Sequence, residues 1–340
     1  MTERYNDGHR AFLQAFMARS TMTVEEAHAV LAAIFSVNEK ERVSPEDISE
    51  DDFSSYIAAA NSAISPFDLE IRSTLTQSTI DPDATTNRRP ERIYALVNTT
   101  SDALIQLATT YSADEIAFVK RVLDAMFDTH NTRRSEAMVV SGIQAIQLAK
   151  ASAGDSNRRE SNMDSQTQTQ TQTQGGAAQS LSMSQAETVL RQLVNDGWFE
   201  KSRKGYYSLS PRGLMELRGW LVATYNDENE DGGRMEKVKF CAACRDIITV
   251  GQRCANRDCK GRLHDHCVQN FFRVQQAEQC PVCKAAWPGD KFVGERAITS
   301  TEQSTQNRRR NTDTQRQSGV RSSSQLPSTN ANDEEDADSD

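Results

Sequence analysis

The chain has 340 residues, a formal net charge of -9, 37% hydrophobic residues, 6% aromatic residues and a mean hydropathy of -0.66. This length allows two or three domains, and the low apolar content predicts that part of the chain is disordered. Six of the last eight residues are carboxylates, so the rest is nearly neutral and bulk charge does not indicate a nucleic-acid-binding protein. There is no apolar stretch of about 18 residues and no hydrophobic signal core, which predicts a soluble intracellular protein without a membrane span.

Residues 1–110 predict a first winged-helix domain. Thr23 and Glu26 have the spacing of a capping box, which marks the start of a helix. The expected elements are helices within 9–36, a helical region that starts at Ser44-Pro45, and strands at 69–71 and 93–97. Helices followed by a two-stranded hairpin are typical of a winged helix.

Residues 111–225 repeat this pattern and predict a second winged-helix domain. Ser112 and Glu115 form another capping box, and Gly197 is suited to end a helix. The expected elements are helices from 112, over 136–148 and over 184–194, a hairpin of 198–202 and 206–208, and a helix from Ser210-Pro211. The Ser/Asn/Gln/Thr-rich tract 151–180 cannot bury a core, which predicts a disordered insertion.

Two further segments predict separation and disorder. Residues 226–240 begin with an acidic, glycine-ended run, which predicts a linker between the winged helices and an independent module. The tail 291–340 is rich in Ser, Thr, Gln and Arg and predicts disorder. Within it, Arg308-Arg309-Arg310 is typical of a nuclear-import patch or a nucleic-acid contact, or of a solvated charge cluster.

All seven cysteines lie between positions 241 and 283. Together with one histidine they form four spaced pairs: Cys241 and Cys244, Cys254 and Cys259, His264 and Cys267, Cys280 and Cys283. Eight such ligands complete two tetrahedral zinc sites, and closed four-ligand sites are structural. A disulfide framework fits poorly because the cysteine count is odd, and a redox motif would need a strand-to-helix context.

The four pairs allow sequential or interleaved sites. Interleaving gives one ion Cys241, Cys244, His264 and Cys267, and gives the other Cys254, Cys259, Cys280 and Cys283. Such a cross-brace ties together a segment too short to build a sufficient core without metal. His266 also lies near Cys267, but the two-residue gap favours His264 as the ligand. We call residues 241–290 the zinc module.

The ligand order, the Cys280-Pro281-Val282-Cys283 pair and Trp287 shortly after it resemble a variant RING finger. With two preceding winged-helix patterns, residues 1–290 resemble non-SMC element one, the RING-like subunit of the SMC-five/six chromosome-maintenance complex. The resemblance implies a nuclear, chromosome-associated ubiquitin ligase subunit that acts in DNA repair and recombination. It also implies two zinc ions, a MAGE-type winged-helix partner, the other subunits of that complex and a ubiquitin-conjugating enzyme.

The resemblance also implies where the conjugating enzyme binds. Carried over by motif, this surface consists of Ala243, Ile247, Pro281, Lys284 and Trp287. A core role for Trp287 is equally consistent with the usual burial of tryptophan. Active RING fingers usually have a large apolar residue between the first two ligands, where this chain has Ala242 and Ala243, so we expect activity that depends on the partner. No residue is expected to act as a covalent nucleophile.

Other functions remain open from the residues alone. A PHD-type histone reader has a tryptophan two residues before the seventh ligand, where this chain has Glu278. A non-catalytic docking subunit would have the same fold as the ligase. Weak DNA contact is expected at the basic wing around Arg203 and Lys204, or through the partner, because Arg191 is the only cation of the helix 184–194.

Overall fold

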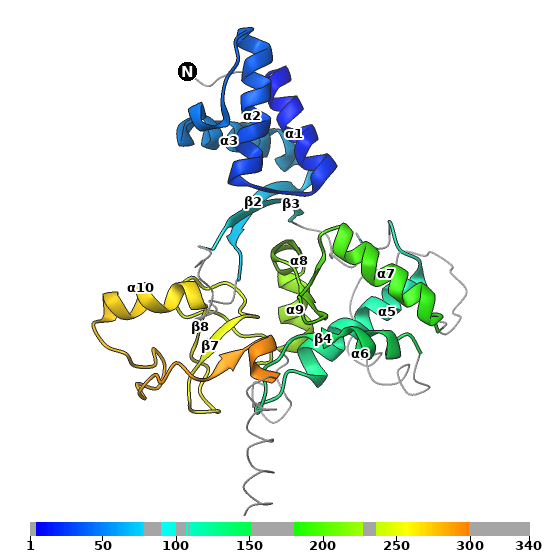
Figure 1. The fold of residues 1–340 in the computed structure, drawn as a ribbon, viewed down its shortest axis with the longest axis vertical. Coiled ribbons are helices and arrows are strands. Elements are labelled where there is room, and N and C mark those ends of the chain that lie inside the picture. The colour runs from blue at the N-terminus through cyan, green and yellow to red at the C-terminus, as the bar shows by residue number, and fades with distance from the viewer. Residues whose placement is uncertain are drawn as a thin grey trace, which may run out of the picture. The chain divides into compact units, whose positions relative to one another are not determined.

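The computed structural model describes residues 5–77, 90–99, 107, 109–150, 180–226 and 236–298 (Figure 1). The Gln/Thr insertion, most of the acidic linker, and the tail with its arginine cluster therefore lie outside the described residues. Within the described ranges, no helix is both long and apolar enough to cross a membrane.

The first domain has the winged-helix order of three helices and three strands. Its elements are α1 (Asp7–Arg19), β1 (Thr21–Thr23), α2 (Val24–Glu39), α3 (Glu50–Ile64), β2 (Leu69–Leu75) and β3 (Arg92–Asn98). The strands pair antiparallel in the order β1-β3-β2. The three helices bury an aromatic core that includes Phe12, Phe16 and Phe53. The predicted capping box at Thr23 opens α2.

Two details of the first domain differ from the sequence prediction. Ser44-Pro45 opens only the 3₁₀ turn η1 (Pro45–Asp47), and α3 is capped instead by Ser49 with Asp52. The prediction also missed β1, because a three-residue strand directly after a helix shows no alternation of its own. A second 3₁₀ turn, η2 (Ser65–Phe67), follows α3.

The second domain repeats the same order. Its elements are α5 (Ala113–Asp124), the π-helical turn η3 (Ala125–Thr129), β4 (Val140–Ser141), α6 (Gly142–Gln147), α7 (Met183–Asn195), β5 (Phe199–Lys201), β6 (Tyr206–Leu209), α8 (Pro211–Glu216) and α9 (Arg218–Tyr225). The sheet order is β4-β6-β5. Gly197 has φ of 74°, the left-handed conformation predicted for the residue that ends α7.

The helix predicted over 136–148 is shorter than expected. Ser141 caps α6 through its hydrogen bond with the Gln144 backbone, so the helix begins at Gly142. The preceding residues 137–140 are buried but not helical, because Met138 has a left-handed φ of 47° and Val140 begins β4. Glu136 consequently lies in a loop, where its side chain faces the zinc module instead of solvent.

The zinc module adds a small sheet and one helix. Its elements are β7 (Gly251–Arg253), β8 (Arg262–Leu263) and α10 (Asp265–Gln275), and β9 (Phe292–Val293) follows. The strand order is β8-β7-β9, so β9 completes the sheet from outside the predicted module. The prediction of disorder from residue 291 is therefore wrong for residues 291–298, because β9 pairs with β7 and Ala297 is buried.

The zinc module also shares a core with the second winged helix. Val238, Ile247 and Val293 are buried in the same hydrophobic cluster as Leu123 and Leu190 of that domain. An acidic linker predicted an independent module, and this prediction is wrong. Val238, near the end of the linker, and Val293, just after the module, both pack into the core of the second winged helix. The zinc module therefore has no separate core where it meets that domain.

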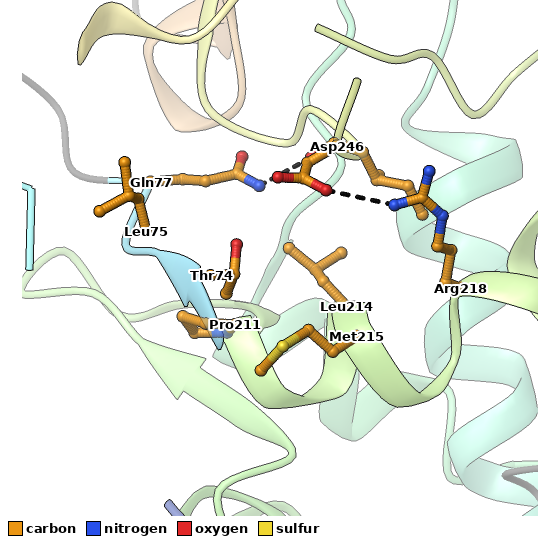
Figure 2. A pocket seen from close by; sticks show the side chains of 9 residues that line it. Thr74, Leu75, Gln77, Pro211, Leu214, Met215, Arg218 and Asp246 are labelled. Atoms are coloured by element: carbon orange, nitrogen blue, oxygen red, sulfur yellow. Dashed lines mark hydrogen bonds and ion pairs between the residues drawn. The ribbon is translucent and has the colours of Figure 1, made fainter. Parts of the chain in front are cut away.

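The first domain also contacts the zinc module (Figure 2). Gln77, just after β2, donates from Nε2 to the carbonyl of Ile247 at 2.7 Å. Its Oε1 accepts from the backbone N–H groups of Thr249 at 2.9 Å and Val250 at 3.1 Å. A cavity lies beside this contact and is lined by β2, α8 and the loop around Asp246. Its volume of about 30 Å³ is roughly space for one water. Arg218 bridges to Asp246 at 3.2 Å.

Candidate metal centre

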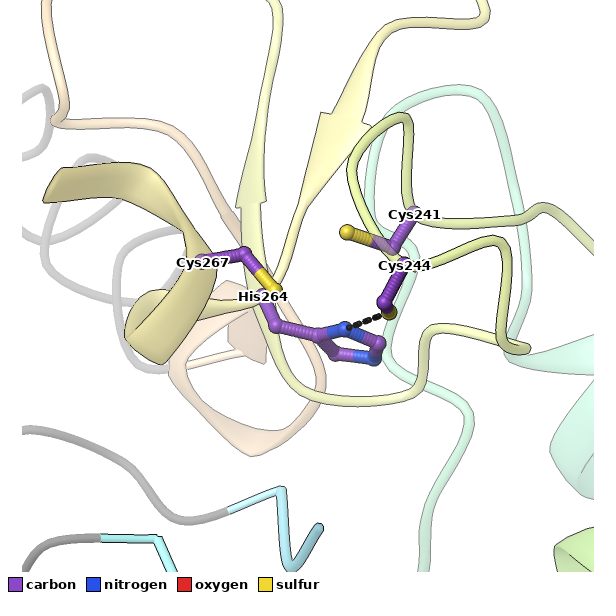
Figure 3. Close-up of side chains that lie close together, drawn as sticks. All are labelled: Cys241, Cys244, His264 and Cys267. Carbon is purple, nitrogen blue, oxygen red and sulfur yellow. Dashed lines mark hydrogen bonds between the residues drawn. The ribbon is translucent and has the colours of Figure 1, made fainter. Parts of the chain in front are cut away.

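The eight predicted ligands form two clusters. Cluster one contains Cys241, Cys244, His264 and Cys267; cluster two contains Cys254, Cys259, Cys280 and Cys283. Within each cluster, the ligand atoms all lie within 4.8 Å of one another. The pairs therefore interleave, and the chain crosses between the clusters three times. Figure 3 shows cluster one, with its side chains converging from two loops and the start of α10.

The spacing of these atoms fits zinc. Tetrahedral coordination with Zn–S bonds of about 2.3 Å places two sulfurs about 3.8 Å apart. In cluster two, Cys254 Sγ lies 3.5 Å from Cys283 Sγ, and Cys259 Sγ lies 3.5 Å from Cys280 Sγ. In cluster one, Cys244 Sγ lies 3.3 Å from His264 Nδ1. Two closed sets of soft ligands match two structural zinc ions.

Both Cys-x-x-Cys pairs sit on the same kind of turn. The residue after each pair is left-handed: Arg245 has φ of 68° and Lys284 has φ of 61°. Each donates its backbone N–H to the backbone carbonyl of the first cysteine of its pair, at 3.0 Å for Arg245 and 3.1 Å for Lys284. A hydrogen bond from the Ala285 backbone lowers the pKa of the Cys283 thiol to about 7, which favours the thiolate that a metal requires.

The two nearby histidines have different roles. His264 contributes Nδ1 to cluster one, and its Nε2 lies 3.3 Å from the carbonyl of Ile247. A hydrogen bond from Nε2 fixes the tautomer that leaves Nδ1 free to bind metal. His266 stacks on His264 with ring centroids 5.0 Å apart and is outside both clusters.

Cluster two is packed so closely that one position requires glycine. A Cβ atom at Gly261 would lie 2.5 Å from Cys280 Sγ. The Gly261 carbonyl also accepts a hydrogen bond from the Cys254 backbone at 3.0 Å, which draws the loop onto the cluster. Sequence reasoning missed this residue because a glycine between ligands reads as an ordinary turn residue.

A buried ionic cluster lies outside the ligands and was also missed. Arg262 is 0% exposed and Glu136 is 2% exposed, and the guanidinium binds the carboxylate through Nε at 2.7 Å and Nη2 at 2.5 Å. Burial by itself raises the pKa of Glu136, but Arg262 and Lys239 outweigh burial and lower it to about 2. Glu136 is therefore ionised at neutral pH. No sequence signal pairs these residues, which lie 126 positions apart.

The structure separates the five residues predicted to bind a conjugating enzyme. Ala243 and Lys284 are exposed, and Pro281 is half-buried. Ile247 is 3% exposed in the core shared with the second winged helix, and Trp287 is 6% exposed in the core of the zinc module. The prediction of one exposed patch including these two side chains is therefore wrong. Trp287 instead packs edge-on against Phe272 and donates from Nε1 to Gln252 at 2.9 Å.

The basic wing of the second domain is partly engaged within the chain. Lys201 lies over the ring of Tyr207, and Lys204 pairs with Glu295 at 3.5 Å. Arg203 is exposed, as is Arg191 on α7. Lys201, Arg203 and Lys204 nonetheless all remain exposed to solvent. Weak DNA contact at this wing stays a prediction.

Tandem winged helices joined to a cross-braced, two-zinc RING-like module define the class of this protein. Residues 9–217 match the family model described as the Nse1 non-SMC component of the SMC5-6 complex, and residues 241–283 match a RING-like domain. The chain belongs to this Nse1 family.

Known relatives agree with this assignment. The chain is 23% identical over 282 residues to the human protein named non-structural maintenance of chromosomes element 1 homolog, covering 83% of this chain and 84% of that protein. It is 25% identical over 174 residues to the budding-yeast element 1, covering 50% of this chain and 48% of that protein. A solved structure of an Nse1-Nse3-Nse4 complex superimposes with a TM-score of 0.58 at 21% identity, covering 84% of this chain and 98% of the matched chain.

The purified protein is expected to bind two zinc ions per chain, because each cluster supplies four ligands and both are closed. Elemental analysis of folded protein, with mass spectrometry under native conditions, measures this number directly. A stoichiometry of one or zero zinc ions in folded protein would contradict the site described here.

Proposed function

We propose that this chain is a RING-type ubiquitin ligase subunit of an SMC5-6 complex. The observation that carries the proposal is the pair of complete four-ligand clusters, with the second Cys-x-x-Cys turn presenting Pro281, Val282 and Lys284 outward. Family membership supports the complex, and the RING-like module supports the ligase. Nuclear localisation and a role in DNA repair and recombination belong to the same proposal.

The mechanism that fits this chain is positioning. All seven cysteines lie in the two clusters, so no thiolate remains to form a covalent intermediate with ubiquitin. A rate increase must then come from holding a ubiquitin-charged conjugating enzyme in an attack-ready geometry beside a substrate lysine. When bound, zinc supplies the rigidity of the loops that display this surface.

The surface proposed to bind the conjugating enzyme leaves out the buried Ile247 and Trp287. It comprises Ala243 and, on the second turn, Pro281, Val282 and Lys284. Val282 is 56% exposed, which leaves an apolar side chain on this turn accessible to a partner. Lys284 lies at the end of this turn, with Nζ 3.4 Å from the Pro281 carbonyl, where its charge is accessible to a partner.

Lys284→Glu is expected to reduce partner-stimulated ubiquitin transfer about tenfold, which corresponds to about 1.4 kcal/mol in transition-state stabilisation. Reversing this charge opposes the partner's complementary surface without touching a zinc ligand. The matched control is Lys291→Glu, another exposed lysine that pairs with Asp290. The assay uses purified complex, a charged conjugating enzyme and zinc quantification for each variant. Equal ubiquitin transfer by both variants would show that the conjugating enzyme does not dock at Lys284.

A non-catalytic docking subunit is the second proposed function, favoured by one observation. Ile247, expected at a ligase surface, is buried against the second winged helix, so part of the zinc module serves as a packing surface. Wild-type complex that assembles with two zinc ions but transfers no ubiquitin with any conjugating enzyme would support this function over the ligase.

The partners proposed for this chain follow from the solved relative. Counterparts of Nse3 and Nse4 are proposed to bind it, the first as the MAGE-type winged-helix subunit. Residues 1–225 are proposed as the docking platform for that subunit. DNA contact is proposed to be weak or supplied by the partner.

A further inference from the structure

Glu136 is a buried carboxylate that the second winged helix presents to three cations of the zinc segment. It contacts Arg262 at 2.5 Å and Lys239 Nζ at 2.5 Å, and Arg253 Nη1 lies 3.9 Å away. Its backbone carbonyl also accepts from the Gly294 N–H at 2.8 Å. Glu136 thus binds this part of the chain through both its carboxylate and its backbone carbonyl.

Each of these cations lies within two residues of a zinc ligand. Lys239 precedes Cys241, Arg253 precedes Cys254, and Arg262 precedes His264. Glu136 therefore contacts residues that lie one or two positions along the chain from ligands of both clusters.

Arg262 makes the most direct connection between the two clusters. Its Nη1 donates to the carbonyl of Cys259 at 2.8 Å and to that of Gly261 at 2.7 Å, both at cluster two. Its own carbonyl accepts the N–H of Ala242, in the first turn of cluster one, at 2.9 Å. The position of this one residue therefore fixes backbone at both clusters.

The charges are consistent with this arrangement. Three cations against one carboxylate leave an excess of two positive charges, and Arg253 is only 7% exposed. Zinc bound by four thiolates carries a charge of -2, and zinc bound by three thiolates and a neutral histidine carries -1. The surplus cations thus lie beside centres of opposite net charge, which reduces the cost of their burial.

We propose that Glu136 is a positioning residue for both zinc centres, supplied by the second winged helix and acting through Arg262. The second winged helix thereby supplies one of the residues that surround the zinc ligands and hold them in place. This role is independent of ligase activity, because it concerns how tightly the ligands hold metal.

The test compares Glu136→Gln with Glu216→Gln. The Glu216 side chain is equally buried, at 2% exposure, and pairs with Arg212 of the same helix, so Glu216→Gln alters a buried ion pair of the second winged helix that includes none of the cations at Glu136. Zinc release to a chromogenic chelator and the visible spectrum of cobalt-substituted protein are measured on the full chain, together with the melting temperature.

Glu136→Gln is expected to release zinc at least about tenfold faster than wild type and to shift the cobalt bands, as the loss of outer-layer partners does at metal sites. Glu136→Asp is expected to release zinc at a rate between those of wild type and Glu136→Gln. Glu216→Gln is expected to leave zinc release and the cobalt bands unchanged. Equal acceleration by both glutamine variants, or no acceleration by Glu136→Gln, overturns the proposal.

If Glu136→Gln does not fold, the double variant Glu136→Met with Arg262→Met replaces it. Removing Glu136 together with its most buried cation avoids leaving Arg262 unpaired, although Lys239 and Arg253 still lose this carboxylate. The proposal expects this variant to release zinc faster at a near-normal melting temperature. Release at the wild-type rate would overturn it.

Discussion

Cys280→Ser is expected to release zinc from cluster two, unfold the zinc module and lower the stability of the second winged helix. A structural zinc site contributes about 10–16 kcal/mol of apparent binding free energy at neutral pH, and a small module that loses this contribution cannot remain folded. The effect spreads because Val238, Ile247 and Val293 complete the core of the neighbouring domain. Burial of three such side chains is worth about 1.5–3 kcal/mol each.

Hydrogen exchange resolves how far the effect travels. In the Cys280→Ser protein, α5 around Leu123 is expected to exchange faster, whereas α1 around Phe12 keeps its protection because it lies in a separate core. Ala285→Ser, an exposed change in the same turn, serves as the control. Unchanged protection of α5 would show that the two domains are not coupled. This expectation differs from the independent zinc module that the acidic linker predicted.

The ligand set shows what a sequence can predict. Spacing alone grouped the cysteines in pairs, because a Cys-x-x-Cys turn is a local geometry that local residues specify. The capping boxes at Thr23 and Ser112 were equally readable, since each involves residues three apart. Domain type followed from the order of such local elements.

The surroundings of the site could not be predicted in the same way. Glu136 and Arg262 meet only because the fold brings two distant segments together, and Gln77 meets Ile247 for the same reason, 170 positions away. Ile247 was assigned to an exposed surface because motif resemblance carries no information about what packs beside it. Burial against another domain is a tertiary property.

These long-range contacts suggest how partner binding at the winged helices can influence the zinc module. Gln77 joins the first domain to the loop between Cys244 and Cys254, and Glu136 joins the second domain to Arg262, between Cys259 and His264. Both contacts reach backbone that carries ligands or flanks them. Of the proposed ligase surface, Ala243 lies just before the loop that Gln77 contacts, and this loop is where a partner bound to the winged helices is proposed to act.

Truncation after Gly233, which removes the zinc module, is expected to destabilise the remaining winged helices. The second core loses three buried aliphatic side chains, and Asn226 loses both of its hydrogen bonds to the Val238 backbone. At about 1.5 kcal/mol or more for each side chain, the loss in the free energy of unfolding is at least about 4.5 kcal/mol, which corresponds to roughly 10 °C or more in melting temperature for a fragment of this size. Partner binding is expected to weaken in proportion to the unfolded fraction.

Calorimetry and partner titration on two fragments separate this effect from general truncation. The fragment that ends at residue 298 keeps every described residue of the core and is expected to melt as the full chain does. The fragment that ends at residue 233 is expected to melt earlier and to bind the partner more weakly, with affinity recovering at lower temperature as the second domain refolds. If both fragments melt and bind alike, the zinc module is an independent appendage, and the shared core contributes nothing to the docking platform.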